Sequence, residues 1–163
     1  EMEKMIDEYL AFARGQGGEA PVPADLSALL SDIVEGARRN DTVLELDAEA
    51  ALNLPLQPNA IKRCLTNLID NAVRYGEQVE IRARRVGESV EVLVEDDGPG
   101  IPPESIEDVF KPFYRLDNSR NPNYAGAGLG LAIARDVARS HGGDIMLQKS
   151  ALGGLRAVLR LPV

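Results

Sequence analysis

The stretch Val90–Pro103, VEVLVEDDGPGIPP, decides how this chain folds and where it acts. Valine recurs at every second position from 90 to 94, with Glu and Leu between, and this is the period of a strand. The run breaks at Asp96–Gly100, so a carboxylate is held where the strand ends. The two glycines that follow it let the backbone turn tightly and come close to a flat ligand. The stretch therefore predicts a nucleotide pocket at this strand end.

The composition is that of one acidic globular domain. The chain has 163 residues, 44% of them hydrophobic and 27% charged, and a formal net charge of −8. This balance predicts a soluble domain without a membrane span, and it argues against a nucleic-acid-binding surface, which needs clustered Lys and Arg. The single cysteine, Cys64, excludes an internal disulfide and falls on an apolar helix face, where a packing role is expected.

Residues 1–18 are predicted to stand apart from the domain proper. Apolar side chains recur at helical spacing from 2 to 14, which indicates the end of an amphipathic helix, and the glycines at 15–18 stop it. Pro21–Pro23 is predicted to continue the linker. A helix from Leu26 to near Asn40 is then expected, followed by strands at 42–47 and 52–54.

The helix that begins after Gln57 carries two stripes of side chains. One is apolar and is expected to face the core. The other lies nearly opposite and consists of Arg63, Asn67, Asn71 and Arg74. One interpretation of the second stripe is a solvated face. The other rests on the two asparagines, which are poor helix formers and whose amide oxygens suit a magnesium ion shared with phosphates.

A hairpin, a lid and a glycine-rich turn are predicted to complete the pocket. Strands at 79–86 and 89–95 form the hairpin that delivers Asp96, and a short helix is expected at 103–110. Residues 111–125 lack periodicity, and because loops of this length are usually functional we interpret them as a lid. Gly126–Gly130, GAGLG, opens a helix and can present backbone N–H groups to an anion. The alternative is a flexible linker before a close-packed helix.

Two further strands, at 144–149 and 155–161, are predicted to close the sheet around Gly153-Gly154. His141 is the only histidine of the chain. It precedes a Gly-Gly turn at a helix end, where a capping or packing role is expected.

Four segments, in this order, resemble one protein family: NLIDNAVRYG (67–76), DDGPGIP (96–102), FKPFYR (110–115) and GAGLGLAI (126–133). They resemble the N, G1, F and G2 boxes of the histidine-kinase catalytic domain, within the gyrase, heat-shock chaperone, histidine kinase and MutL ATPase superfamily, and look most like the EnvZ osmosensor type. The resemblance runs from about residue 24 to the C-terminus. It implies an α+β fold, a two-layer α/β sandwich (the Bergerat ATP-binding fold), in which a mixed, mainly antiparallel sheet packs on three helices with an ATP lid.

Carried over by position, the resemblance implies that Asn71 binds Mg²⁺ with help from Asn67, and that Asp96 accepts a hydrogen bond from the adenine amino group. Guanine would be rejected because it has an acceptor at that place. The implied catalytic residues are Asn67, Asn71 and Arg115. The residues implied to bind ATP are Asn67, Asn71, Arg74, Tyr75, Asp96, Gly98, Gly100, Ile101, Lys111, Tyr114, Arg115, Gly126, Gly128, Leu129, Gly130 and Leu131.

Two positions depart from the family pattern. Ala127 stands where the family usually has Thr, so one hydroxyl contact to phosphate is absent. Arg63 stands where the hydrolysing members and many kinases carry a Glu that could orient a nucleophile, so no base for activating water is evident. This favours phosphoryl transfer to a side chain over hydrolysis, because transfer needs mainly positioning and charge neutralisation.

The resemblance also implies a larger parent protein. The acceptor would be a histidine on a helix upstream of residue 1, with residues 1–18 as the end of the second helix of a dimerisation and phosphotransfer hairpin plus linker, and residues 19–163 as the catalytic domain. The parent would be a homodimer anchored in the inner membrane, with this domain on the cytoplasmic side and a response regulator as partner. Two other hypotheses stay open: a superfamily ATPase that drives conformational change, and a nucleotide-sensing module that transfers nothing.

Overall fold

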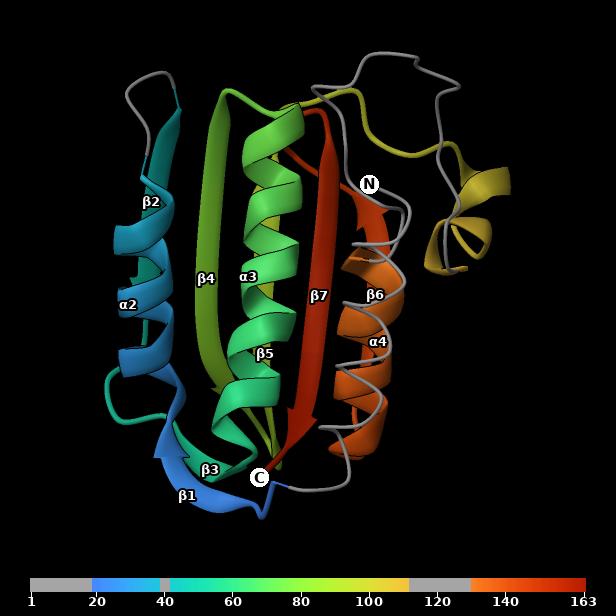
Figure 1. Ribbon diagram of the computed structural model, residues 1–163. Helices are drawn as coiled ribbons and strands as arrows, with labels where there is room; N and C mark the ends of the chain where they lie inside the picture. Colours follow the sequence, from blue (N-terminus) through green and yellow to red (C-terminus); the bar gives the residue numbers. More distant parts are fainter. Residues whose placement is uncertain (1–18, 39–41, 112–129) are drawn as a thin grey trace, which may run out of the picture.

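The computed structural model describes residues 19–38, 42–111 and 130–163. A five-stranded sheet is covered on one face by three helices (Figure 1). In chain order the elements are β1 (Val22–Asp25), α2 (Leu26–Ala37), β2 (Val43–Ala48), β3 (Asn53–Leu56), α3 (Pro58–Tyr75), β4 (Gln78–Val86), β5 (Ser89–Asp96), η1 (Pro103–Ser105), η2 (Asp108–Phe110), α4 (Gly130–Ser140), β6 (Asp144–Lys149) and β7 (Leu155–Pro162).

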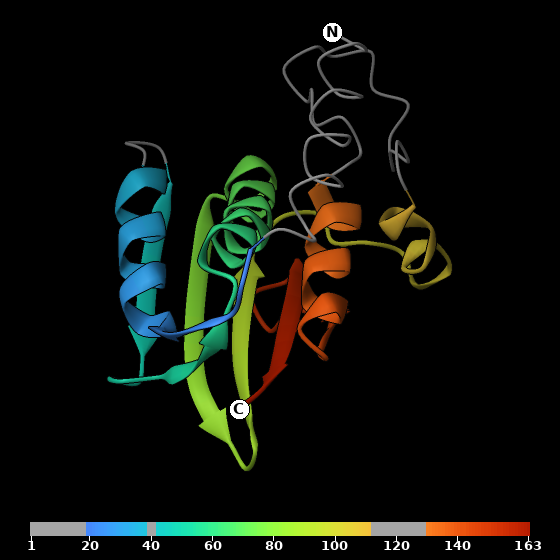
Figure 2. The same cartoon turned by 60° about the horizontal axis from the view of Figure 1, so that its bottom comes forward.

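The sheet has the strand order β2-β4-β5-β7-β6, in which β2 and β4 run parallel and the other pairs run antiparallel. Helices α2, α3 and α4 lie side by side on one face, as Figures 1 and 2 both show. The predicted α+β sandwich, with a mainly antiparallel mixed sheet against three helices, is therefore confirmed. Strand β5 is the middle strand, so the pattern that begins at Val90 runs through the centre of the molecule.

The core lies between α3 and the sheet because both present one apolar face. The valines of β5 at 90, 92 and 94 are almost fully buried, and so is the apolar stripe of α3. Cys64 belongs to that stripe, as predicted, and burial raises the pKa of its thiol to about 12. The buried residues of α3 are Ile61, Cys64, Leu65, Leu68, Ile69 and Ala72.

Two local predictions were wrong. Pro21–Pro23 was expected to be linker, but β1 pairs antiparallel with β3, and Pro23 stands at the same register position as Pro55. A proline in a short two-stranded sheet removes few ladder hydrogen bonds, so the strand tolerates it. The helix expected at 103–110 is instead two 3₁₀ turns, η1 and η2, of three residues each.

The first helix also ends earlier than predicted. Helix α2 ends at Ala37, and Arg38 is already extended. At its start, the Asp25 side chain accepts a hydrogen bond from the Ser27 N–H at 3.0 Å, which is a typical N-terminal cap. The predicted segment at 1–18 lies outside the described residues, and so does the predicted lid at 111–125 apart from Lys111.

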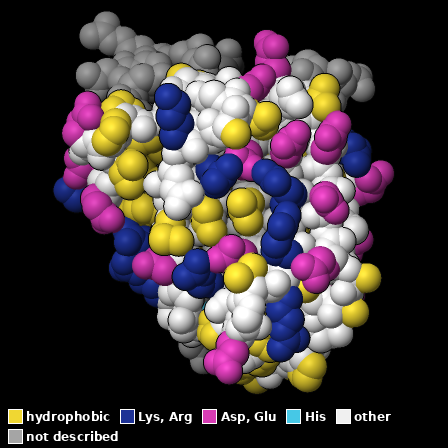
Figure 3. All heavy atoms as spheres, turned by 180° about the vertical axis from the view of Figure 1, so that it is seen from behind, with side chains coloured by type: hydrophobic (Ala, Val, Ile, Leu, Met, Phe, Trp, Pro, Cys, Tyr) yellow, Lys and Arg dark blue, Asp and Glu magenta, His cyan; other side chains and the backbone are white. Residues whose placement is uncertain are grey.

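None of the described helices lies on the far face of the sheet. Seen from behind, acidic and basic side chains interleave there with a few apolar ones (Figure 3). Polar side chains lie on this face because a strand has a period of two, so the residues between the buried valines of β5 point away from the helices. Among the described helices, none is both long and apolar enough to cross a membrane.

Candidate functional site

Asp96 ends strand β5, and its side chain is only 3% exposed. The Gly98 N–H donates to its Oδ1 at 2.9 Å, and the Leu155 N–H donates to the same oxygen at 3.2 Å. No donor within the described residues reaches Oδ2. The carboxylate is thus held by one oxygen and retains the other as an acceptor.

The protonation of Asp96 is perturbed in a direction typical of a functional site. Burial raises the pKa of its carboxyl, and the hydrogen bonds from Gly98 and Leu155 counteract this only in part. The negative charge of Asp97 next to it adds to the rise. Perturbed carboxyls in clefts are common at binding sites, so this observation supports the predicted pocket.

Backbone approaches Asp96 closely at two glycines. A Cβ atom at Gly98 would lie 2.6 Å from the carbonyl oxygen of Tyr75, and a Cβ atom at Gly154 would overlap Asp96 Oδ1. Side chains are therefore excluded on both sides of the carboxylate. The end of α3 and the β6–β7 turn can both pack against Asp96 for this reason.

Asn67 and Asn71 lie one turn apart on α3, and both side chains are half-buried. The Asn67 side-chain amide donates to the Gly130 carbonyl oxygen at 3.3 Å, at the start of α4. No hydrogen bond to the Asn71 amide occurs among the described residues. The predicted asparagine stripe therefore faces the beginning of α4, which is where the glycine-rich turn ends, and it is not simply a solvated face.

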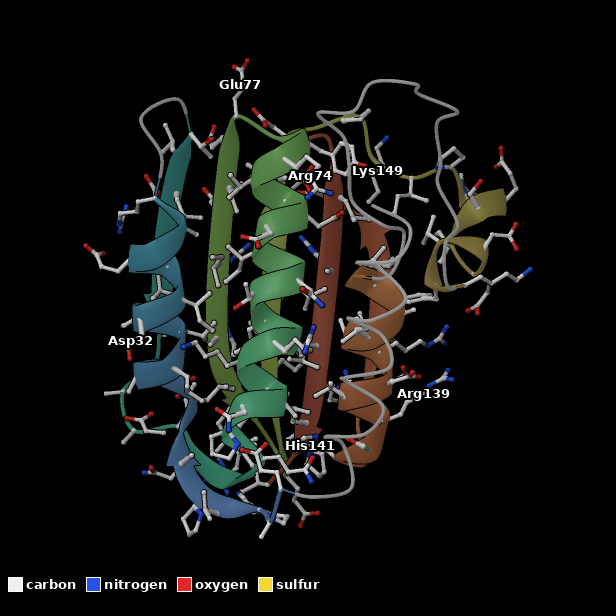
Figure 4. All side chains as sticks on the ribbon, viewed as in Figure 1. Asp32, Arg74, Glu77, Arg139, His141 and Lys149 are labelled. Carbon is white, nitrogen blue, oxygen red and sulfur yellow. The ribbon has the colours of Figure 1, made fainter. Side chains whose placement is uncertain are left out.

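The last turn of α3 brings Arg74 and Tyr75 to the same end of the sheet as Asp96. Both side chains are exposed, Tyr75 by 39%. Figure 4 shows Arg74 and Lys149 at this end and His141 at the opposite end. A positively charged side chain thus lies near the strand end that carries the buried carboxylate.

The remaining predicted residues in the described part are placed as follows. Ile101 and Leu131 are partly buried against the core, and Gly100 has a φ of 74°, which favours glycine. Lys111 is exposed and forms an ion pair with Asp108 at 2.8 Å. The predicted contact of Lys111 with phosphate stays a prediction.

Arg135 fastens the segment before the predicted lid to α4. Its guanidinium lies 4.2 Å from the centre of the Phe110 ring and forms ion pairs with Glu107 at 3.1 Å and Asp144 at 3.2 Å. Because η2 is a single 3₁₀ turn, this contact gives it a fixed position. The chain therefore enters 112–129 from a defined point.

The other predicted residues lie outside the described part of the chain. These are Tyr114, Arg115, Gly126, Gly128 and Leu129, together with the unusual Ala127.

Sequence reasoning missed Gly154 and Leu155. It assigned Gly153-Gly154 only to a hairpin turn, yet this turn supplies a donor to Asp96 across 59 positions of sequence. The double glycine before the last strand was the only available signal. A backbone donor leaves no side-chain pattern, so this contact could not be inferred from residue types.

Comparison with known proteins agrees with this geometry. Residues 56–163 match the model of the "Histidine kinase-, DNA gyrase B-, and HSP90-like ATPase" family. The sensor histidine kinase GtrS of Pseudomonas aeruginosa is 44% identical over 138 residues, which are 85% of this chain and 28% of GtrS. The chain thus spans less than a third of that relative's length.

Two solved structures share the fold. The ATP-binding domain of PrrB from Mycobacterium tuberculosis is 30% identical with a TM-score of 0.74, and the match covers 88% of this chain and 98% of that domain. The histidine kinase domain of the Escherichia coli osmosensor EnvZ is 35% identical with a TM-score of 0.68, over 90% of this chain and 92% of that domain. The similarity expected from the four sequence segments is confirmed.

Proposed function

Because this chain belongs to the histidine kinase-, DNA gyrase B- and HSP90-like ATPase family and is an ATP-binding domain of the sensor histidine kinase type, we propose that it transfers the γ-phosphate of ATP to a histidine side chain. The observation that best supports this is the Asp96 carboxylate, which is buried at a strand end and held by Oδ1 alone. Its second oxygen is an acceptor that suits the amino group of adenine.

Base recognition follows from this geometry. Asp96 Oδ2 accepts a hydrogen bond from the adenine amino group. Gly98 and Gly100 would lie beside the ring, and their lack of a side chain lets the chain pack against the backbone of Tyr75 and Gly154. Tyr75, partly exposed at the end of α3, flanks the base, with Ile101 on the apolar side of the pocket. Guanine presents an acceptor to the same oxygen, and two acceptors facing each other without a proton are unfavourable. The pocket therefore selects ATP over GTP.

The donor set on α3 fits magnesium. Asn71 would ligate the ion through its amide oxygen, and Asn67, which is anchored to the Gly130 carbonyl, would assist from the same face. When bound, Mg²⁺ supplies charge neutralisation for the triphosphate. The hydrogen bond from Asn67 also holds Gly130, the first residue of α4, against α3.

The phosphates would be bound by cations and by backbone donors. Arg74 projects from the end of α3, and Lys111 lies where the chain leaves η2. Arg115 and Tyr114 belong to the predicted lid. The backbone N–H groups of the turn that leads into α4 would cradle the polyphosphate at the positive end of the helix dipole, and they come from Gly126, Gly128, Leu129, Gly130 and Leu131.

The similarity to sensor histidine kinases supports a proposal for the acceptor and the partners. The acceptor would be a histidine on a dimerisation helical hairpin of the parent protein, with residues 1–18 as the last part of that hairpin and its linker, and residues 19–163 as the catalytic domain. The phosphate would then pass to a response regulator. The parent would be a homodimer anchored in a membrane, with this domain on the cytoplasmic side.

The test is a transfer assay. The chain is mixed with ATP labelled at the γ-phosphate, Mg²⁺ and a separately made histidine hairpin from a sensor kinase. We expect acid-labile label on the hairpin, and much less label when Asp96 is replaced by Asn and ATP is kept below its saturating concentration. The matched control is Asp97→Asn, which changes the exposed neighbouring carboxylate and is expected to transfer normally.

The other outcomes identify the competing hypotheses. Release of free phosphate without labelled hairpin would assign the chain to the ATPases. Nucleotide binding without either product, repeated with hairpins from several kinases, would leave a nucleotide-sensing module.

A further inference from the structure

A charged cluster of the buried Glu95 and the partly exposed Arg82 and Arg156 lies on the face of the sheet opposite the helices, next to Asp96 along β5. Glu95 is 1% exposed, yet it is one residue from Asp96 on β5 and points to the other face. Arg156 Nε donates to its Oε1 at 2.9 Å, and Arg82 Nη2 donates to its Oε2 at 2.6 Å. Burial alone raises the pKa of Glu95, but the hydrogen bonds from Arg156, Arg82 and Ser150 outweigh it, so its pKa lies below the ordinary value.

Ser150 connects this cluster to the β6–β7 turn. Its side chain is 4% exposed, and its hydroxyl donates to Glu95 Oε1 at 3.0 Å. The same hydroxyl accepts from the Leu152 N–H at 3.0 Å, while the Ser150 backbone N–H donates to the Gly154 carbonyl oxygen at 2.9 Å. The turn is therefore held both internally and to Glu95. A buried hydrogen-bonded group of this kind has a strongly preferred geometry.

The same turn holds Asp96 from the pocket side. The Gly154 N–H donates to the Asp96 carbonyl oxygen at 3.1 Å, and the next residue, Leu155, donates to the Asp96 carboxylate. The turn thus wraps around the end of the sheet and contacts two successive carboxylates of β5 on opposite faces. Any shift of the turn away from Glu95 moves the donor that keeps Asp96 Oδ1 occupied.

We propose that Ser150 and Glu95 are positioning residues for base recognition: the cluster with Arg82 and Arg156 fixes the β6–β7 turn, and the turn orients the Asp96 carboxylate. The inference rests on the proposed role of Asp96 in binding adenine. Without the Leu155 N–H, Asp96 Oδ1 keeps only the hydrogen bond from the Gly98 N–H, so the carboxylate is less firmly oriented and the position of the Oδ2 acceptor is less well defined. Preorganised polar groups bind more tightly than groups that must be ordered by the ligand.

The test measures the affinities of the chain for ATP and for GTP by calorimetry in wild type and in Ser150→Ala. We expect the affinity for ATP to fall by about 3- to 10-fold and the affinity for GTP to change less, because one hydrogen-bonding interaction is weakened and only adenine uses it. The ratio of ATP to GTP affinity therefore narrows. Ser150→Thr keeps the hydroxyl and is expected to restore most of the ratio.

A matched pair of glutamates separates positioning from stability. Glu91 lies on the same face of β5 and pairs with Arg160 of β7, as Glu95 pairs with Arg156, but it is four residues further from the pocket. Glu95→Gln is expected to lower the ratio of ATP affinity to GTP affinity, whereas Glu91→Gln is expected to leave this ratio unchanged. If both variants lower the unfolding temperature but neither they nor Ser150→Ala alter the ratio, the cluster is only structural and the inference is wrong.

The double variant distinguishes this inference from the proposed function. In an Asp96→Asn background, Ser150→Ala is expected to have no further effect on the ratio. If Asp96→Asn itself leaves ATP affinity unchanged, the adenine site lies elsewhere and both proposals fail. If Asp96→Asn removes binding but Ser150→Ala has no effect, only the positioning role is overturned.

Discussion

The two ends of helix α3 use polar groups in opposite ways. At its first turn, the Glu19 carboxylate accepts hydrogen bonds from the N–H groups of Asn59 and Ala60 at 3.0 and 3.2 Å, and the Gln57 N–H donates to His141 Nε2 at 3.1 Å. At its other end, within the described residues, Asp96 Oδ2 and the Asn71 amide have no hydrogen-bond partner. No buried side-chain polar atom among the described residues lacks a partner, so these two groups are accessible from outside and can bind the proposed ligand.

The hydrogen bonds at the first turn of α3 also indicate which ring nitrogen of His141, the only histidine of the chain, carries a proton. His141 Nδ1 lies 2.8 Å from the Val137 carbonyl oxygen, which can only accept, so Nδ1 carries the proton. Nε2 is then the acceptor for the Gln57 N–H. His141 thus has the structural role expected from its place before the Gly-Gly turn, and it joins the end of α4 to the start of α3.

The largest expected effect on ATP affinity is at the end of α3 that lies near Asp96. Asp96→Asn is expected to weaken ATP binding by about 10- to 100-fold, since a hydrogen bond to a charged group contributes about 1.5–3 kcal/mol. Calorimetry with ATP measures this loss. An ATP affinity within threefold of wild type would mean that the end of α3 near Asp96 is not the end that binds adenine.

The next largest effect is expected at the first turn of α3, where a substitution should lower stability and leave ATP affinity unchanged. His141→Phe removes two hydrogen bonds and is expected to lower the free energy of unfolding by about 2 kcal/mol, which corresponds to an unfolding temperature lower by about 4–8 °C. ATP affinity at a temperature well below unfolding is expected to stay the same. The transfer assay with γ-labelled ATP gives a second check: label found on His141 itself would contradict a purely structural role.

A smaller effect is expected from the face of α3 that is proposed to bind Mg²⁺. Asn71→Ala should reduce ATP affinity about tenfold when Mg²⁺ is present, equivalent to ~1.4 kcal/mol, and should have little effect when the ion is chelated. Asn59→Ala, on the exposed first turn of the same helix, is the matched control. An equal loss with and without Mg²⁺ would show that Asn71 acts on packing and not on the ion.

The smallest effect is a dependence on pH. Because the pKa of Asp96 is raised, its carboxylate becomes protonated, and ATP affinity falls, at a pH above the ordinary value of about 3.9. Glu95 behaves in the opposite way: its pKa is lowered, so its contribution to stability is present above the ordinary pKa and is lost only as pH falls through the lowered one.

This dependence can be measured as ATP affinity from about pH 7 to about pH 4.5, a range over which the fold retains the Glu95 contribution. We expect a severalfold decline in wild type beyond that seen in Asp96→Asn, which corrects for titration of ATP itself. The raised pKa has the opposite sign for folding: the cost of the ionised Asp96 carboxylate is relieved as pH falls through that pKa. Parallel curves for the two proteins would contradict the assignment of Asp96.

Much of the fold was predictable because its elements have clear periods. The alternation around Val92 and the stripe that contains Leu65 each specified one buried face, and the structure confirms both. The strand at Val22–Asp25 was not predicted because local propensity assigns a proline-containing segment to a linker. The segment forms a strand because it pairs with β3, which is distant in the sequence. The 3₁₀ turns near Phe110 were taken for a helix because three-residue turns share its spacing over a single repeat.

The sequence by itself determined the family, the layered fold and the identity of the carboxylate at position 96, since these depend on residue types at fixed short spacings. Only the tertiary structure decided how that carboxylate is held. The Leu155 N–H reaches Asp96 across 59 positions, and the His141 ring meets Gln57 across 84. Such contacts depend on backbone atoms that every residue carries, so they acquire a partner only when the sheet brings distant strands together.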